Sequence, residues 1–114
     1  MGMSDSQSTE TKIQDEVLRL ILDHKKSIEA RYRSDAIRDL VKLGVDKKNN
    51  DTDVPPKYIQ HFDTKEGRVG FSVTKAMASH VKAYAATHEI EYQQAYFEYI
   101  CCGLEKANGK KPLA

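Results

Sequence analysis

Three residues at alternate positions, Arg68, Gly70 and Ser72, form the pattern in this sequence that most suggests ligand recognition. Residues 68–73 alternate polar or small residues with apolar ones, a period of two that predicts a β-strand with one buried face. The three residues would share its exposed face. A guanidinium can bind guanine through two hydrogen bonds, and a serine hydroxyl can donate or accept one. The pattern therefore favours a face that reads the edges of bases in double-stranded DNA, with Arg68 as the strongest candidate.

Basic residues on both sides of this strand are candidates for contacts with DNA phosphates. The whole chain has a net charge of only +1, but residues 65–82 carry four basic residues against one acidic, whereas residues 89–106 carry four acidic against one basic. The first of these segments is thus the one suited to a polyanion. We expect phosphate contacts from Lys65, Thr74, Lys75 and Lys82.

The strand needs a partner, because an unpaired strand leaves backbone hydrogen-bonding groups unsatisfied. Two amphipathic helices follow it, the first capped by Thr74, and the sequence shows no second strong strand. The simplest partner is the same strand of a second copy across a two-fold axis. We therefore expect an intertwined homodimer whose core is formed by Val69, Phe71, Val73, Met77, Val81, Tyr84, Tyr92, Tyr96, Tyr99 and Ile100.

Residues 68–85 resemble the strand and first helix of the ribbon-helix-helix superfamily, typified by the Arc and methionine repressors. The match lies in its apolar and capping positions, which here hold Val73, Thr74, Met77, Val81 and Ala85. The resemblance implies a two-stranded ribbon in the major groove and a phosphate bound by the backbone amides that follow Thr74. It also implies a sequence-specific DNA-binding protein that acts as a transcriptional repressor or as a plasmid or phage accessory factor.

The N-terminal half is predicted to be helical, with one amphipathic helix over residues 13–30 and another over residues 35–43. Gly44 is placed where a left-handed residue could end the second helix. Three interpretations remain open: a helical hairpin that strengthens the dimer, a degenerate first ribbon-helix-helix repeat, or an independent DNA-contacting helix. Equal numbers of basic and acidic residues over residues 1–60 favour the oligomerising role. The third interpretation would use Arg31, Arg33, Arg38 and Lys42.

The expected fold class is mainly α, with a ribbon-helix-helix unit in the C-terminal half, an N-terminal helical hairpin and an intertwined homodimer. Five segments follow from the pattern. They are a disordered tail (1–12), the hairpin or degenerate repeat (13–45), a polar linker (46–64), the DNA-binding and dimerisation unit (65–107) and a flexible tail (108–114).

The sequence gives no indication of an enzyme. The histidines are scattered, the two cysteines are adjacent, and neither a metal-binding spacing nor a catalytic grouping is recognisable. We therefore expect no catalytic residue, metal or cofactor, and a cytoplasmic protein without a membrane span. The expected partners are double-stranded DNA, a second copy of the chain with further assembly on DNA, and a protein bound by the N-terminal helices.

A second function class stays open beside DNA binding. A dimeric helical interaction module, such as an adaptor or an antitoxin-like protein, would use similar helices without specific DNA binding. Phe97 and Cys101 lie off the main apolar stripe of their helix, which suits a second buried surface in an intertwined dimer or a patch for another protein.

Overall fold

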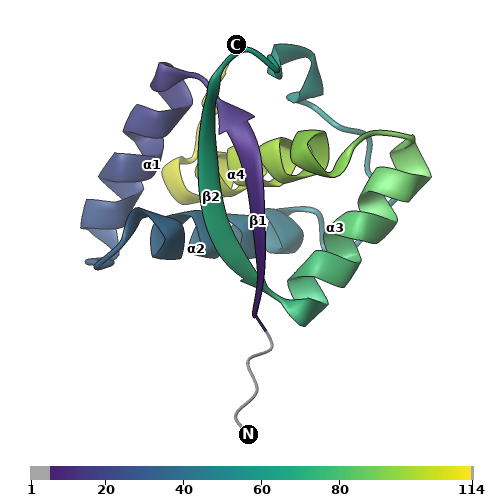
Figure 1. Ribbon diagram of the computed structural model, residues 1–114, viewed down its shortest axis with the longest axis horizontal. Coiled ribbons are helices and arrows are strands. Elements are labelled where there is room, and N and C mark those ends of the chain that lie inside the picture. The colour runs from purple at the N-terminus through teal and green to yellow at the C-terminus, as the bar shows by residue number, and fades with distance from the viewer. Residues whose placement is uncertain (1–5, 114) are drawn as a thin grey trace, which may run out of the picture.

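The computed structural model describes residues 6–113 and has the order strand, helix, helix in both halves of the chain (Figure 1). The first half contains β1 (Ser6–Ile13), α1 (Asp15–Ser27) and α2 (Arg33–Lys47). A 3-10 turn, η1 (Ile59–His61), interrupts the connection, and the second half contains β2 (Gly67–Thr74), α3 (Lys75–His88) and α4 (Tyr92–Asn108). The expected fold class is therefore wrong, because the N-terminal half is not a helical hairpin but begins with a strand of its own.

The ribbon is formed by β1 and β2 of the same chain. They pair in antiparallel register, with Ser6 opposite Thr74 and Ile13 opposite Gly67. This pairing corrects the expected intertwined homodimer, because β2 obtains its backbone partners within the chain. It also corrects the expected disordered tail over residues 1–12, of which residues 6–12 belong to β1 and residues 1–5 lie outside the described residues.

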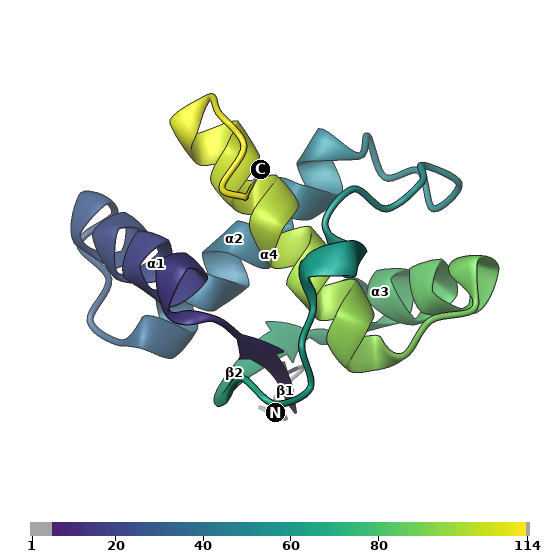
Figure 2. The same ribbon diagram turned by 90° about the horizontal axis from the view of Figure 1, so that it is seen from above.

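Helices α2 and α4 lie side by side behind the ribbon, and α1 and α3 flank them on opposite sides (Figure 2). The inner face of the ribbon packs on this helical layer, and the rings of Phe71 and Tyr96 meet edge to face with centroids 5.3 Å apart. Most residues expected in a dimer core are instead buried in the core of one chain, with Met77 partly buried. The expectation that Tyr92 belongs to this core is wrong, since its side chain is 53% exposed at the start of α4.

The second helices of the two halves cross with their backbones in contact at Gly44 and Gly103. Each glycine is buried and stands twelfth in its helix. A Cβ atom at Gly44 would overlap the carbonyl oxygen of Tyr99, and one at Gly103 would overlap that of Leu40. The predicted helix end at Gly44 is thus wrong, because α2 continues to Lys47 and the left-handed residues come later, at Asn49 and Asn50.

The connection between the halves is bound to α4 by the buried carboxylate of Glu98. This carboxylate accepts hydrogen bonds from the ammonium of Lys48 at 3.0 Å and from the backbone amides of Lys57 and Tyr58 at 3.0 and 2.7 Å. Lys48 and Glu98 are 2% and 0% exposed, so the ion pair has almost no contact with water. The Lys48 ammonium also lies 4.9 Å from the ring centroid of Tyr84. The expected polar linker over residues 46–64 is therefore held to α4 at Lys48, Lys57 and Tyr58, while most of its residues are exposed.

The same connection covers the second apolar surface of α4. The ring of Phe62 packs edge-on against Phe97, with centroids 5.6 Å apart, and Cys101 is fully buried. Phe97 and Cys101 thus face residues of their own chain, neither an intertwined dimer nor another protein. Within the expected flexible tail over residues 108–114, Leu113 is 8% exposed and belongs to the buried core, and Ala114 lies outside the described residues.

Replacing Gly103 by Ala tests the helix crossing. We expect Gly103→Ala to lower the free energy of unfolding by about 2 kcal/mol or more, because backbone atoms of Leu40 occupy the space of the added methyl group. Urea denaturation measures the loss. Gly67→Ala is the control, since its Cβ would lie 3.9 Å from the nearest backbone oxygen, and it should change stability by less than about 0.5 kcal/mol. Equal midpoints for the two variants would contradict the close crossing.

Replacing Glu98 by Gln tests the buried ion pair. We expect Glu98→Gln to destabilise the fold by about 3–5 kcal/mol, because the Lys48 ammonium is left buried without its counter-charge. The double variant Lys48→Met with Glu98→Gln removes both charges and should recover part of the loss. Urea denaturation of the three proteins provides the comparison. A loss below about 1 kcal/mol in the single variant would mean that the pair behaves like a solvent-exposed one.

Candidate nucleic-acid interface

The outer face of the ribbon carries three cross-strand pairs beyond the terminal pair of Ser6 with Thr74, because residues opposite one another in an antiparallel ladder point to the same side. The expected base-reading residues Arg68, Gly70 and Ser72 all lie on this face and are exposed or partly exposed. From β1 the face receives three residues that were absent from the expected site. The pairs are Ser8 with Ser72, Glu10 with Gly70, and Lys12 with Arg68.

The contribution of β1 was missed because Ile13 is the one apolar residue of its inner face, which is too few to make a strand recognisable. Seven of its eight residues are polar. A weaker signal was available in Thr9, Thr11 and Ile13, since β-branched residues at alternate positions favour a strand. Thr11 is fully buried, and its hydroxyl donates to the carbonyl of Gln93 at 2.6 Å. A buried polar residue thus holds a position of β1 where an apolar residue would have indicated a strand in the sequence.

Arg68 is held by an acidic neighbour on the same face. Its Nε lies 3.3 Å from Oε2 of Glu10, with side chains 66% and 42% exposed. The side-chain amide of Gln93 donates to the same oxygen in a long hydrogen bond of 3.4 Å, which gives Glu10 a second contact. Exposed ion pairs contribute only about 0–1 kcal/mol, so Arg68 can exchange Glu10 for a ligand at little cost. Because Gly70, which lies opposite Glu10, has no side chain, a ligand has access to both Glu10 and Arg68.

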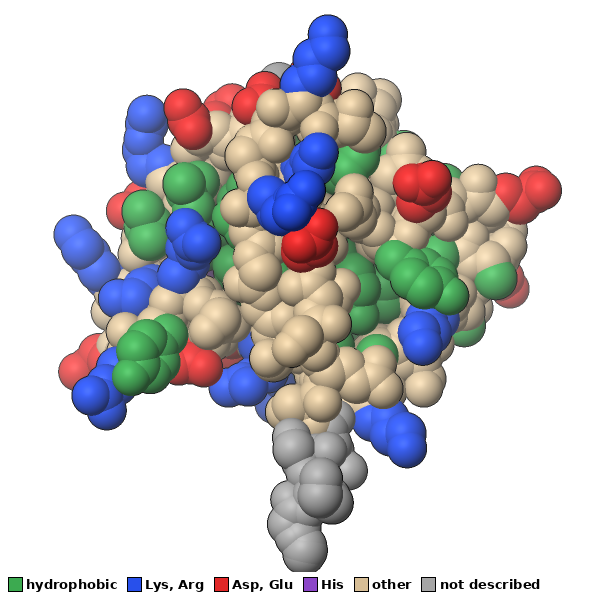
Figure 3. All heavy atoms as spheres, in the orientation of Figure 1, with side chains coloured by type: hydrophobic (Ala, Val, Ile, Leu, Met, Phe, Trp, Pro, Cys, Tyr) green, Lys and Arg blue, Asp and Glu red, His purple; other side chains and the backbone are tan. Residues whose placement is uncertain are grey.

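Charged side chains gather at one end of the outer face. Figure 3 looks onto the ribbon and shows basic and acidic side chains near its upper end, with an uncharged surface below. The pairing places Lys12, Arg68 and Glu10 toward the charged end and the serine pair toward the other. The outer face is therefore polar along its length and charged at one end.

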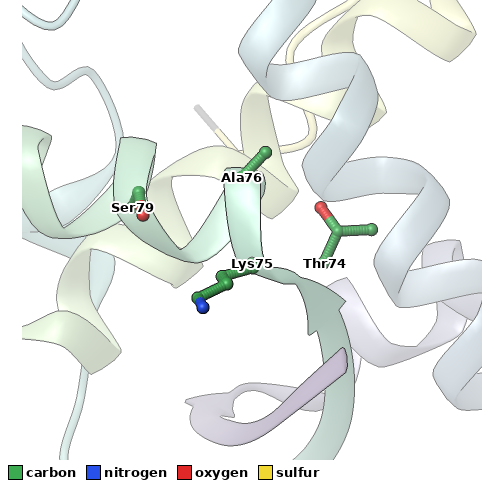
Figure 4. A pocket seen from close by; sticks show the side chains of 4 residues that line it. All are labelled: Thr74, Lys75, Ala76 and Ser79. Atoms are coloured by element: carbon green, nitrogen blue, oxygen red, sulfur yellow. The ribbon is translucent and has the colours of Figure 1, made fainter. Parts of the chain in front are cut away.

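A shallow hollow lies where β2 runs into α3, and two of the expected phosphate-binding residues line it. Thr74, Lys75, Ala76 and Ser79 surround it (Figure 4). The Thr74 hydroxyl caps α3 by accepting the backbone amide of Met77 at 3.1 Å, as the sequence predicted. Its own hydrogen stays available for donation to an anion. Lys75, the first residue of the helix, is exposed.

The other two expected phosphate-binding residues lie elsewhere. Lys65 is exposed in the loop before β2, at the far end of the ribbon from Thr74. Lys82 follows Lys75 by seven residues, or about two helical turns, and its ammonium lies 6.0 Å from the ring centroid of Tyr92. The structure thus brings together Thr74 and Lys75 but not all four residues.

Two basic residues of α2 adjoin Thr74 and add charge to this region. Arg38 and Lys42 line a second hollow together with Thr74 and Met77, and the acidic residues Asp35 and Asp39 line it as well. Arg38 also contacts Asp35 at 3.1 Å in a partly exposed pair. We refer to Thr74, Lys75, Arg38 and Lys42 as the basic corner. In the other half the corresponding strand-to-helix junction begins α1 with Asp15 and Glu16, so the helix starts at the two ends of the ribbon differ in charge.

Hydrogen bonds occupy three of the histidines. The Nε2 atoms of His24, His80 and His88 lie 2.7 Å from Asp39 Oδ2, the Tyr99 hydroxyl and the Thr52 carbonyl, respectively. Within residues 6–113, no three His, Cys, Asp or Glu side chains are grouped so that they could hold a metal ion. Burial, with the charge of Glu98, raises the pKa of the Cys102 thiol to about 12, which keeps it protonated and unreactive near neutral pH.

Comparison of the chain with protein-family models, with curated proteins and with solved structures finds no match. Over the part of the chain that the structure describes, the helices lack the combination of length and apolar character needed to cross a bilayer. The geometry of the ribbon and of the basic corner is therefore the basis for assigning a function.

Substituting Thr74 tests its structural role separately from ligand binding. We expect Thr74→Ala to lower the free energy of unfolding by about 1 kcal/mol, because the amide of Met77 loses its acceptor. Thr74→Ser keeps the hydroxyl and should retain most of the stability. Thermal or urea unfolding distinguishes the two, and equal losses would show that the hydrogen bond at the helix start does not contribute.

Proposed function

We propose that this protein binds double-stranded DNA sequence-specifically by inserting the outer face of the β1–β2 ribbon into the major groove. The observation that supports the proposal is a two-stranded antiparallel ribbon whose inner face is buried on helices while its outer face presents polar side chains. A ribbon of two strands has the size that the major groove admits. The polar outer residues would then reach the edges of the bases.

Both strands would contribute to base recognition. Arg68 is suited to guanine, whose two acceptors match the geometry of a guanidinium. Glu10 can accept from the amino group of cytosine, or it can hold Arg68 in the direction that suits guanine. Lys12 also suits guanine, whereas Ser8 and Ser72 discriminate little. The proposed reading set is therefore broader than Arg68 alone.

The basic corner would bind phosphates beside one end of the ribbon. Lys75, Arg38 and Lys42 supply positive charge there, and the Thr74 hydroxyl has a hydrogen to donate. At the junction in the other half, Asp15 and Glu16 would repel a phosphate. We therefore propose an asymmetric DNA site with stronger backbone contacts on one side. Such a site need not be palindromic, since the two strands of the ribbon differ in sequence.

One chain supplies a whole ribbon, so we propose one chain per DNA site. The homodimer expected from the sequence rested on a strand without a partner, and that reason no longer applies. The strand-helix-helix order in both halves agrees with the proposed membership of the ribbon-helix-helix superfamily. The role implied by that resemblance, a repressor or a plasmid or phage accessory factor, remains part of the proposal.

Selection from random double-stranded DNA, followed by binding measurements on the selected sequence, tests this function. We expect Arg68→Ala to reduce the preference for the selected over a scrambled sequence by about tenfold, because a bidentate contact contributes roughly 1–3 kcal/mol of discrimination. Lys75→Ala should weaken binding to both sequences equally. It should also lower the slope of log affinity against log salt by about one, since one phosphate contact is lost.

Lys106→Ala is the matched control, because this exposed lysine lies near the end of α4 and not among the residues assigned to the ribbon or the basic corner. It should leave both affinity and preference unchanged. The proposal fails if no sequence is selected at moderate salt, or if Arg68→Ala leaves the preference intact.

A further inference from the structure

The two halves of the molecule are related by an approximate two-fold axis, so surfaces in one half have counterparts in the other. The strands pair antiparallel, and Gly44 and Gly103 occupy the same place in α2 and α4. The groove between α1 and α4 in one half therefore corresponds to the groove between α3 and α2 in the other. Figure 2 shows α1 and α3 on opposite sides of the central helix pair.

The groove beside α4 is occupied by the connection between the halves. Tyr58 is 2% exposed there, and its hydroxyl donates to Glu105 at 3.1 Å while its backbone amide donates to Glu98. Four residues later, Phe62 packs on Phe97. A segment with a tyrosine anchor, turned through the 3-10 residues Ile59–His61, thus packs on α4 in this groove, where two carboxylates of α4 bind it.

The corresponding groove between α2 and α3 is open. Its floor is formed by Val45, Ala76 and Met77, and Lys42, Asp46 and His80 stand at its rim. Burial and the charge of Lys48 lower the pKa of His80, so His80 is neutral near pH 7 and Lys42 is the cation of this rim. The open groove therefore has an apolar floor with one positive and one negative charge beside it.

Helix positions show which features of the filled groove are kept in the open one. Asp39 and Asp46 stand in α2 where Glu98 and Glu105 stand in α4, so both carboxylates are retained. The apolar residues Phe97 and Cys101 of α4 are not retained, because the equivalent positions of α2 hold Arg38 and Lys42. A segment bound in the open groove would thus keep a tyrosine anchor but would need an acidic residue where the connection has Phe62.

We infer that the α2–α3 groove binds a turned segment of a partner protein, with a tyrosine followed four residues later by an acidic residue, as Phe62 follows Tyr58 across the 3-10 turn. The tyrosine ring would cover Val45 and Met77, and its hydroxyl would donate to Asp46. The acidic side chain would face Arg38 and Lys42, one turn apart on α2, in a hollow that Asp35 and Asp39 also line; Asp39 is bonded to His24. Arg38 is free to do so because its contact with Asp35 is partly exposed. This inference does not depend on DNA binding.

The test is a titration of the isotope-labelled protein, followed by NMR, with a synthetic peptide that copies the connection. The peptide Pro-Pro-Lys-Tyr-Ile-Gln-His-Glu carries residues 55–61 and replaces Phe62 by Glu. We expect saturable shifts at Val45, Ala76 and Met77. Lys42→Glu should weaken binding about tenfold, the equivalent of losing one charge-assisted contact. A peptide ending in Lys should bind this variant better than it binds the unaltered protein.

Two controls keep the interpretation specific. Lys26→Glu makes the same charge change at an exposed position of α1 and should leave peptide binding unchanged. The peptide with Ala in place of Tyr should no longer bind. The inference is overturned if no saturable shift appears at millimolar peptide, or if Lys42→Glu and Lys26→Glu bind equally. It is also overturned if the groove resonances shift with protein concentration alone and sedimentation shows association, because the occupant would then be a second copy.

Discussion

The close crossing of α2 and α4 is the constraint on which the rest of the structure depends. Gly44 and Gly103 let the two backbones touch, and no larger residue fits at either place without displacing main-chain atoms. The crossing has the same residue at the same helical position on both sides, which agrees with an approximate two-fold relation of the halves. The antiparallel pairing of β1 with β2 in front of these helices follows the same relation.

The buried carboxylate of Glu98 makes the two halves unequal. Burying an ion pair has a large desolvation cost, which hydrogen bonds from Lys48 and two backbone amides offset here. Those bonds fix the path of the connection across α4, and Tyr58 and Phe62 then fill the groove on that side. The equivalent carboxylate of α2, Asp39, bonds instead to His24 of its own half. One groove is consequently filled and the other open.

This inequality matters for the proposed recognition of DNA. The backbone of the ribbon is nearly symmetric, but its outer side chains and the helix starts beside it are not. A symmetric dimer presents the same residues twice, whereas a single chain can assign Arg68 and Lys12 to one end and two serines to the other. Joining both halves in one chain thus allows each to vary independently, and the basic corner is one result.

Local patterns in the sequence determined β2, α3, α4 and the cap at Thr74, because alternation, helical stripes and capping depend on neighbouring residues. Tertiary structure alone decided the partner of β2. The inner face of β1 is polar except for Ile13, and its buried Thr11 bonds to Gln93, far along the chain. Gly44 likewise suggested a helix end, since nothing local shows that another backbone passes beside it. Neither contact can be predicted from sequence neighbours. The order of elements and the residues of the outer face were therefore decided only by the tertiary structure.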